Sequence, residues 1–148
     1  MIRVFIADDH TIFREGLKQI LADEADVDIV GEATDGDELL AQLPSAPCDI
    51  VLLDLTMPGR SGISLLREIA AAEDRRVVVL SMHEEDQYIV EALKAGAAGY
   101  VTKNSASDQL IQAIRKVVQG ELFVSPTASQ SLIRQLRAPR AELPHIRL

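Results

Sequence analysis

Five polar residues stand at the ends of four apolar runs, where their chemistry could be combined. Asp8 and Asp9 follow the first run, Asp54 ends the third, Ser81 ends the fourth and Lys103 follows the fifth. Ligand sites in open parallel sheets lie beyond the carboxyl ends of the strands. If the runs form such a sheet, these side chains converge on one of its edges. A lone acid at such a place is often only a helix cap, but the joint arrangement favours a site.

The three carboxylates offer the hard oxygen ligands that Mg²⁺ prefers, because this ion is usually held by one or two carboxylates, waters and a phosphate oxygen. The strand ends themselves carry no histidine or cysteine, which makes zinc a poorer fit. His10 directly follows the first pair of acids. We expect it to begin a helix rather than to act as a ligand or phosphoacceptor. The set therefore predicts a magnesium site.

The same residues are suited to phosphoryl transfer. A carboxylate can act as a nucleophile and carry an acyl phosphate. The transfer requires positive charge and hydrogen-bond donors around the moving oxygens. Mg²⁺, the ammonium group of Lys103 and the hydroxyl group of Ser81 would supply them. We therefore expect phosphate chemistry at this edge of the sheet.

The elements that must position this set follow from the apolar pattern. The runs at 3–8, 49–54 and 76–81 are nearly continuous in Val, Ile and Leu, which is typical of strands buried on both faces. Two further runs lie at 27–33 and 98–103. Segments with helical spacing separate the runs. Five repeats of strand and helix predict a doubly wound α/β fold, with helices on both faces of a parallel sheet.

Two local signals mark where helices begin. Asp35 followed by Glu38 is a capping-box-like pair ahead of an apolar helical segment. Gly62 lies near the expected start of another helix, where it allows a close approach of the backbone.

Composition limits the class of protein. The chain has 148 residues, of which 47% are hydrophobic, and a formal net charge of -8. This length suits one globular domain with its own core. No apolar run approaches the roughly 18 residues of a membrane span, and Cys48 as the single cysteine excludes an internal disulfide framework. We expect a soluble cytoplasmic protein whose acid excess disfavours nucleic-acid binding by this domain.

The composition changes near the C-terminus. Ser125 and Pro126 suit the start of a further helix, which would be too short to be stable without a packing partner. Beyond residue 131 the charge turns basic, with Arg134, Arg137, Arg140 and Arg147 against Glu142 alone. We expect a domain over 1–120 and a helical linker with a basic tail over 121–148.

Four motifs carry a resemblance to a known family. ADDH at 7–10, LLDLTMPGRSG at 52–62, LS at 80–81 and ALKAGAAGYVTK at 92–103 together resemble the receiver domain of bacterial two-component response regulators. The resemblance covers about residues 1–120 and is strongest to the NarL/FixJ (LuxR-type) subfamily, in which a linker and a helix-turn-helix domain follow the receiver. It implies a flavodoxin-like, CheY-like sheet of five strands in the order 2-1-3-4-5.

The resemblance implies roles for the acidic set. Asp54 would accept a phosphoryl group from the phosphohistidine of a histidine kinase. Asp8 and Asp9 would form the acidic pocket for Mg²⁺, with Asp8 acting directly or through water. The backbone carbonyl of Thr56 would complete the metal ligands from the protein. The side chains of Thr56 and His83 could approach the attacking water, and simple solvation of both is an equally open reading.

The resemblance also implies a switch. Ser81 would hydrogen-bond the phosphoryl group, Lys103 would pair with its oxygens, and Tyr100 would change rotamer together with Ser81. The alternative for Tyr100 is an ordinary half-buried strand aromatic. Family members commonly have a cis proline after the lysine, but this chain has Asn104, so the geometry of that bond stays open.

The implied partners are a sensor histidine kinase, a second copy of the chain on phosphorylation, and DNA only through a C-terminal helix-turn-helix domain absent from these residues. A membrane is not among them. Two alternatives are a stand-alone receiver acting in a phosphorelay or by protein contacts, and an interaction module that never takes phosphate. An aspartyl-nucleophile phosphatase is disfavoured because Thr56 stands where haloacid-dehalogenase-type enzymes have a second Asp. We expect no enzyme activity beyond the chain's own phosphorylation and dephosphorylation.

Overall fold

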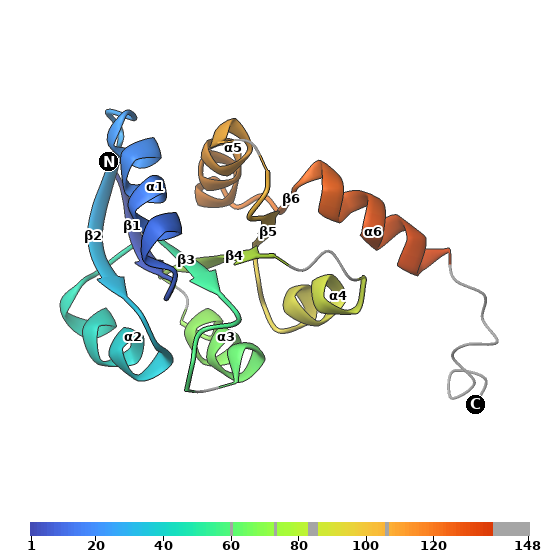
Figure 1. Ribbon diagram of the computed structural model, residues 1–148, viewed down its shortest axis with the longest axis horizontal. Coiled ribbons are helices and arrows are strands. Elements are labelled where there is room, and N and C mark those ends of the chain that lie inside the picture. Colours follow the sequence, from blue (N-terminus) through green and yellow to red (C-terminus); the bar gives the residue numbers. More distant parts are fainter. Residues whose placement is uncertain (60, 73, 83–85, 106, 138–148) are drawn as a thin grey trace.

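The computed structural model describes residues 1–59, 61–72, 74–82, 86–105 and 107–137. Strands and helices alternate along the chain (Figure 1). In order they are β1 (Ile2–Ala7), α1 (Thr11–Ala22), β2 (Val27–Ala33), α2 (Gly36–Gln42), the short 3₁₀ helix η1 (Leu43–Ser45), β3 (Ile50–Asp54), α3 (Gly62–Ala70), β4 (Arg76–Ser81), α4 (Asp86–Lys94), β5 (Gly99–Thr102), α5 (Ser107–Val118), β6 (Phe123–Val124) and α6 (Pro126–Leu136).

The strands form one parallel sheet in the order β2-β1-β3-β4-β5-β6. The predicted doubly wound fold and the order 2-1-3-4-5 are confirmed. The structure adds β6, which pairs Phe123 with Gly99 and Val124 with Tyr100. Two residues are too few to give a strand pattern in the sequence, so β6 was not predicted.

Helices cover both faces of the sheet, with α1 and α5 on one face and α2, α3 and α4 on the other (Figure 1). The central strand β3 is buried along its whole length. Its successive side chains point to opposite faces, so Ile50 and Leu52 join the core beneath α1 and α5, while Val51 and Leu53 join the core on the other face. The continuous apolar runs are therefore explained by burial on two sides.

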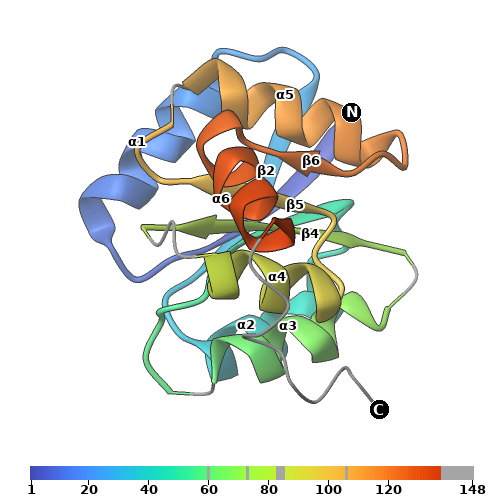
Figure 2. The same cartoon turned by 90° about the vertical axis from the view of Figure 1, so that its right-hand side faces the viewer.

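The C-terminal helix α6 packs beside α4 and over β5 (Figure 2). Ala128 of α6 and Tyr100 of β5 are both fully buried and belong to the same core cluster. The predicted short helix after Ser125 is thus confirmed, and the α4 and β5 surface is the packing partner that it requires. In the part of the chain that is described, no helix is both long and apolar enough to cross a membrane.

Candidate functional site

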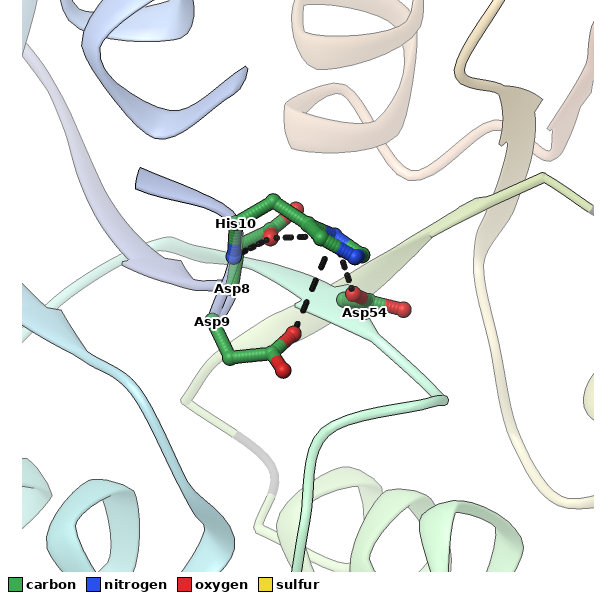
Figure 3. A group of neighbouring side chains, drawn as sticks. All are labelled: Asp8, Asp9, His10 and Asp54. Atoms are coloured by element: carbon green, nitrogen blue, oxygen red, sulfur yellow. Dashed lines mark hydrogen bonds and ion pairs between the residues drawn. The ribbon is translucent and has the colours of Figure 1, made fainter. Parts of the chain in front are cut away.

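The carboxyl ends of β1 and β3 bring four side chains together. Asp8, Asp9, His10 and Asp54 each place one possible ligand atom within 4.8 Å of the others (Figure 3). The acids come from neighbouring strands, because β1 pairs directly with β3. The predicted convergence of the strand-end acids on one edge of the sheet is what the geometry shows.

Asp8 is fully buried and is held from several sides. Its backbone N–H donates to the carbonyl of Ala33 at 3.0 Å, which ties the residue after β1 to the end of β2. Its Oδ1 accepts a hydrogen bond from the backbone N–H of His10 at 2.7 Å. The guanidinium of Arg14 donates to the Asp8 carbonyl at 2.6 Å. Asp8 therefore shapes the turn into α1 as well as lining the site.

Asp9 is the most accessible of the three acids, with 32% of its side chain exposed. Its Oδ1 atom is nevertheless buried, and it has no hydrogen-bond partner among the described residues. A buried carboxylate oxygen without a donor costs free energy. This oxygen is therefore available to an external positive group.

Asp54, the last residue of β3, is 1% exposed. Its Oδ1 accepts two hydrogen bonds from Thr56, at 2.9 Å from the backbone N–H and 2.7 Å from the side-chain hydroxyl. Its Oδ2 accepts a hydrogen bond from Lys103 at 3.1 Å. Gly62 allows the start of α3 to lie against the backbone of Leu55, the residue after Asp54, because a Cβ at Gly62 would collide with the carbonyl oxygen of Leu55. The carboxylate is thus fixed on both sides.

Lys103 brings an ammonium group within hydrogen-bond distance of Asp8 and Asp54. Its side chain is 3% exposed, and its Nζ lies 2.8 Å from Asp8 Oδ2 as well as near Asp54. Its backbone N–H donates to the carbonyl of Ser81 at 2.8 Å, which anchors it at the end of β4. The ring of Phe13 lies 4.6 Å from Nζ. No cis peptide bond occurs in the described ranges, so the Lys103–Asn104 bond is trans.

His10 has two structural roles: its backbone begins α1, and its ring lies against the acids and Lys103. It is the N-cap residue of α1 with an extended backbone, as its predicted position at a helix start requires. Its imidazole Nδ1 also lies 2.9 Å from Lys103 Nζ, 3.3 Å from Asp8 Oδ1 and 3.5 Å from Asp54 Oδ2 (Figure 3). The sequence interpretation missed this second place, although the adjacency of His10 to two acids was its signal.

Ser81 lies in β4, which pairs with β3, and Tyr100 lies in β5, the next strand beyond β4. Ser81 ends β4, is buried and pairs in register with Thr102. Tyr100 is fully buried rather than half-buried, and it pairs with Val79 on one side and Val124 on the other. His83 lies outside the described residues.

A family model for the response regulator receiver domain matches residues 4–115. The chain belongs to the response regulator receiver family. This family acts as phosphorylation-controlled signalling switches of two-component systems rather than as conventional enzymes, and its members typically bind Mg²⁺ at an acidic pocket. The predicted resemblance is confirmed.

Among similar proteins, the transcriptional regulatory protein DegU of Brevibacillus brevis is 36% identical over 92% of this chain and 58% of its own length. The receiver chain thus spans little more than half of that relative. A LuxR-family two-component response regulator from Aurantimonas sp. has a solved structure with a TM-score of 0.86 at 34% identity, covering 92% of this chain and 98% of that one.

The isolated receiver domain of RcsB from Salmonella enterica serovar Typhimurium, solved with the phosphomimetic BeF₃⁻, has a TM-score of 0.83 at 30% identity. That match covers 88% of this receiver and 98% of the RcsB domain. RcsB has also been solved as dimers bound to DNA. These relatives agree with the LuxR-type subfamily indicated by the motifs.

The acid pocket of this receiver fits a divalent cation. Among the described residues, three carboxylates face one buried ammonium group, so negative charge is in excess, and Asp9 Oδ1 is a buried oxygen to which none of these residues donates a hydrogen bond. Hard oxygen ligands of this kind suit Mg²⁺. Thr56 contacts Asp54 through its N–H and its hydroxyl group, and the role of its carbonyl as a metal ligand stays a prediction.

Proposed function

We propose that this receiver accepts a phosphoryl group on Asp54 from the phosphohistidine of a sensor histidine kinase and acts as a cytoplasmic switch. The observation that carries the proposal is the fixed carboxylate of Asp54. It ends a central strand, with Thr56 on one oxygen, Lys103 on the other and the acids of β1 beside it. Because the nucleophile is already held in place, binding of the phosphoryl donor leaves a lower barrier to the transfer.

In the transfer, a carboxylate oxygen of Asp54 forms a bond to phosphorus while the P–N bond of the phosphohistidine breaks. The bonding electron pair returns to the imidazole nitrogen of the kinase. Lys103 is within reach of Asp54 Oδ2 and balances negative charge on the phosphoryl oxygens. Thr56 keeps the carboxylate oriented through two hydrogen bonds.

Asp8, Asp9 and Asp54 are the side chains that would hold Mg²⁺, with the carbonyl of Thr56 as a fourth ligand. The ion supplies charge neutralisation for the phosphoryl oxygens when it is bound. Asp8 keeps its orientation through the His10 N–H and Arg14 contacts. Its burial keeps the pocket free of competing solvent on that side.

The readout of phosphorylation would begin at Ser81 and Tyr100. The new charge draws the hydroxyl group of Ser81 toward Asp54, and Tyr100 follows into the space that opens. The support for this step is position: Ser81 is anchored to Lys103 through its carbonyl, and Tyr100 shares a core cluster with Ala128 of α6. A local charge event becomes a signal only through such a bistable element.

We propose residues 1–120 as the receiver unit and residues 121–148 as a linker. The output would be dimerisation and control of a DNA-binding domain beyond this sequence. The DNA-bound dimers of RcsB support that assignment. The alternative is a receiver that works alone through protein contacts or in a phosphorelay, and it differs in needing no DNA-binding partner domain.

The test is incubation of the chain with Mg²⁺ and a small acyl-phosphate donor, followed by intact-mass measurement. Wild type and Asp49→Asn, an acid remote from the pocket, are expected to gain one phosphoryl group. Asp54→Asn is expected to gain none. Equal labelling of Asp54→Asn, or an unlabelled wild type, contradicts the proposal. Repeated turnover of phosphomonoesters would instead indicate a phosphatase.

A further inference from the structure

The imidazole of His10 has no part in the proposed switch, yet it lies inside the acid pocket. Its Nδ1 is within 3.7 Å of an oxygen of each of the three acids. The side chain is 55% exposed, so it enters from the solvent side, while the carboxylates of Asp8 and Asp54 stay buried. Figure 3 shows the ring directed toward Asp54 rather than away from the site.

The ammonium of Lys103 marks the point on which the possible metal ligands converge. Its Nζ lies 2.8 Å from Asp8 Oδ2, 3.1 Å from Asp54 Oδ2 and 2.9 Å from His10 Nδ1. An ammonium group can only donate hydrogen bonds, so Nδ1 accepts with its lone pair and the ring proton sits on Nε2. A nitrogen lone pair and two carboxylate oxygens therefore already surround one cation.

The backbone fixes His10 in this place. Its N–H donates to Asp8 Oδ1 at 2.7 Å, and its extended conformation at the N-cap of α1 directs the residue back over the end of β1. The acid that lines the pocket thus also positions the imidazole-bearing residue. A fourth possible ligand atom is Asp9 Oδ1, the buried oxygen without a hydrogen-bond partner among the described residues.

We propose that His10 is a nitrogen ligand of the divalent ion and sets which ion the pocket prefers. Imidazole nitrogen adds much more to the binding of transition ions than to the binding of Mg²⁺, which favours oxygen ligands. The ion preference of a pocket with three carboxylates and one imidazole therefore shifts from Mg²⁺ toward Mn²⁺ and its neighbours in the transition series. The inference uses the metal pocket of the proposed function, but it does not depend on phosphorylation.

The experiment compares wild type with His10→Ala, His10→Asn and His145→Ala, the last removing another of the three histidines. Calorimetric titration gives the Kd of each protein for Mn²⁺ and for Mg²⁺. Electron spin echo measurements on the Mn²⁺-loaded proteins, with ¹⁴N or ¹⁵N histidine, report whether an imidazole nitrogen is bound to the ion. Intact-mass measurement of phosphorylation is run on the same samples.

The expected result is a nitrogen signal in wild type and His145→Ala that is absent from both His10 variants. The Kd for Mn²⁺ should rise about tenfold or more in His10→Ala, while the Kd for Mg²⁺ changes less than about threefold. His10→Asn should keep wild-type Mg²⁺ affinity through its amide oxygen and still lose the preference for Mn²⁺.

Two outcomes overturn the inference: no histidine nitrogen on Mn²⁺ in wild type, or tighter binding of both ions by His10→Ala, which would make the ring an obstruction. Phosphorylation of Asp54 without a nitrogen signal rejects the role of His10 and leaves the proposed function standing. A nitrogen signal without phosphorylation supports His10 as a ligand and rejects the proposed function.

Discussion

The ammonium nitrogen of Lys103 lies 3.1 Å from Asp54 Oδ2, and both side chains are almost completely shielded from solvent. The same nitrogen contacts Asp8. Two buried carboxylates, at the ends of β1 and β3, therefore depend on one cation at the end of β5. Removing the charge of Lys103 should therefore cost the fold much more stability than removing the charge of Asp54.

Lys103→Met should destabilise the fold strongly, because Asp8 and Asp54 would remain buried without a cation. Breaking a buried pair in this way costs about 3 kcal/mol or more. Asp54→Asn keeps the Asp8–Lys103 pair and lowers the excess of negative charge, so its cost should stay within about 1 kcal/mol. Urea unfolding without divalent ions measures both, and equal losses would contradict the dependence on Lys103.

Divalent ions should stabilise the folded chain through the same acids. At ten times its Kd, Mg²⁺ adds about 1.4 kcal/mol to the free energy of unfolding. Asp9→Asn removes the negative charge of the carboxylate whose buried Oδ1 has no hydrogen-bond partner among the described residues, and it should abolish most of this gain. Asp28→Asn, an exposed acid on β2, is the matched control and should keep the gain. Thermal unfolding with and without Mg²⁺ measures the stability gain of each variant, and an equal gain in Asp9→Asn and Asp28→Asn would contradict the role of Asp9.

The hydroxyl group of Thr56 should matter for the rate of phosphorylation. Thr56→Val removes its 2.7 Å hydrogen bond to Asp54 and leaves the backbone bond in place. Losing a hydrogen bond to a charged group corresponds to about 1.5 kcal/mol, or about tenfold in rate. Thr56→Ser keeps the hydroxyl group and should stay close to wild type. Time-resolved intact mass gives the rates, and identical rates for both variants would count against this role.

The packing of α6 on the receiver should tolerate little change at Ala128. This residue is fully buried in the cluster that contains Tyr100. Ala128→Leu overfills the space and should cost about 1–3 kcal/mol. Hydrogen exchange should then rise in α6, α4 and β5 together. Ile133→Ala, at a half-exposed position of the same helix, is the control, and exchange confined to α6 in Ala128→Leu would show that the helix packs independently.

Stability at low pH should depend on Asp49. The hydrogen bond from Arg3 holds the pKa of Asp49 below its ordinary value of 3.8. The folded state therefore favours the carboxylate, so this contribution is complete above about pH 4 and is lost as the pH falls through the folded-state pKa. Asp49→Asn should be less stable than wild type at pH 7, with the gap in unfolding free energy closing as the pH falls below about 4. A constant gap in urea unfolding across this range would argue against the linkage.

The sheet and the acidic edge could be predicted because both follow from simple periodicity. Strands buried on two faces need continuous apolar runs, and parallel strands must end together, which places Asp8 beside Asp54. The capping signal at Asp35 also succeeded, since its side chain accepts a hydrogen bond from the Glu38 N–H at 2.8 Å. Each of these depends on spacing along the chain.

Other features depend on side-chain direction or on distant partners, which spacing does not encode. The position of His10 at the helix start was predicted, but the direction of its ring over the acids was not. The hydroxyl contact from Thr56 to Asp54 depends on a rotamer in the same way. The partner of α6 is α4, which lies more than thirty residues earlier in the sequence.

The two-residue strand β6 has a consequence for how copies of this chain can meet. An uncovered sheet edge offers free backbone donors and acceptors, which invite another molecule to add a strand. Here the N–H groups of Phe123 and Ser125 donate to the carbonyls of Ala98 and Tyr100, so the outer side of β5 is used within the chain over that stretch. Strand addition to β5 is therefore blocked over that stretch, and the outermost strands of the sheet are the two-residue β6 at one end and β2 at the other.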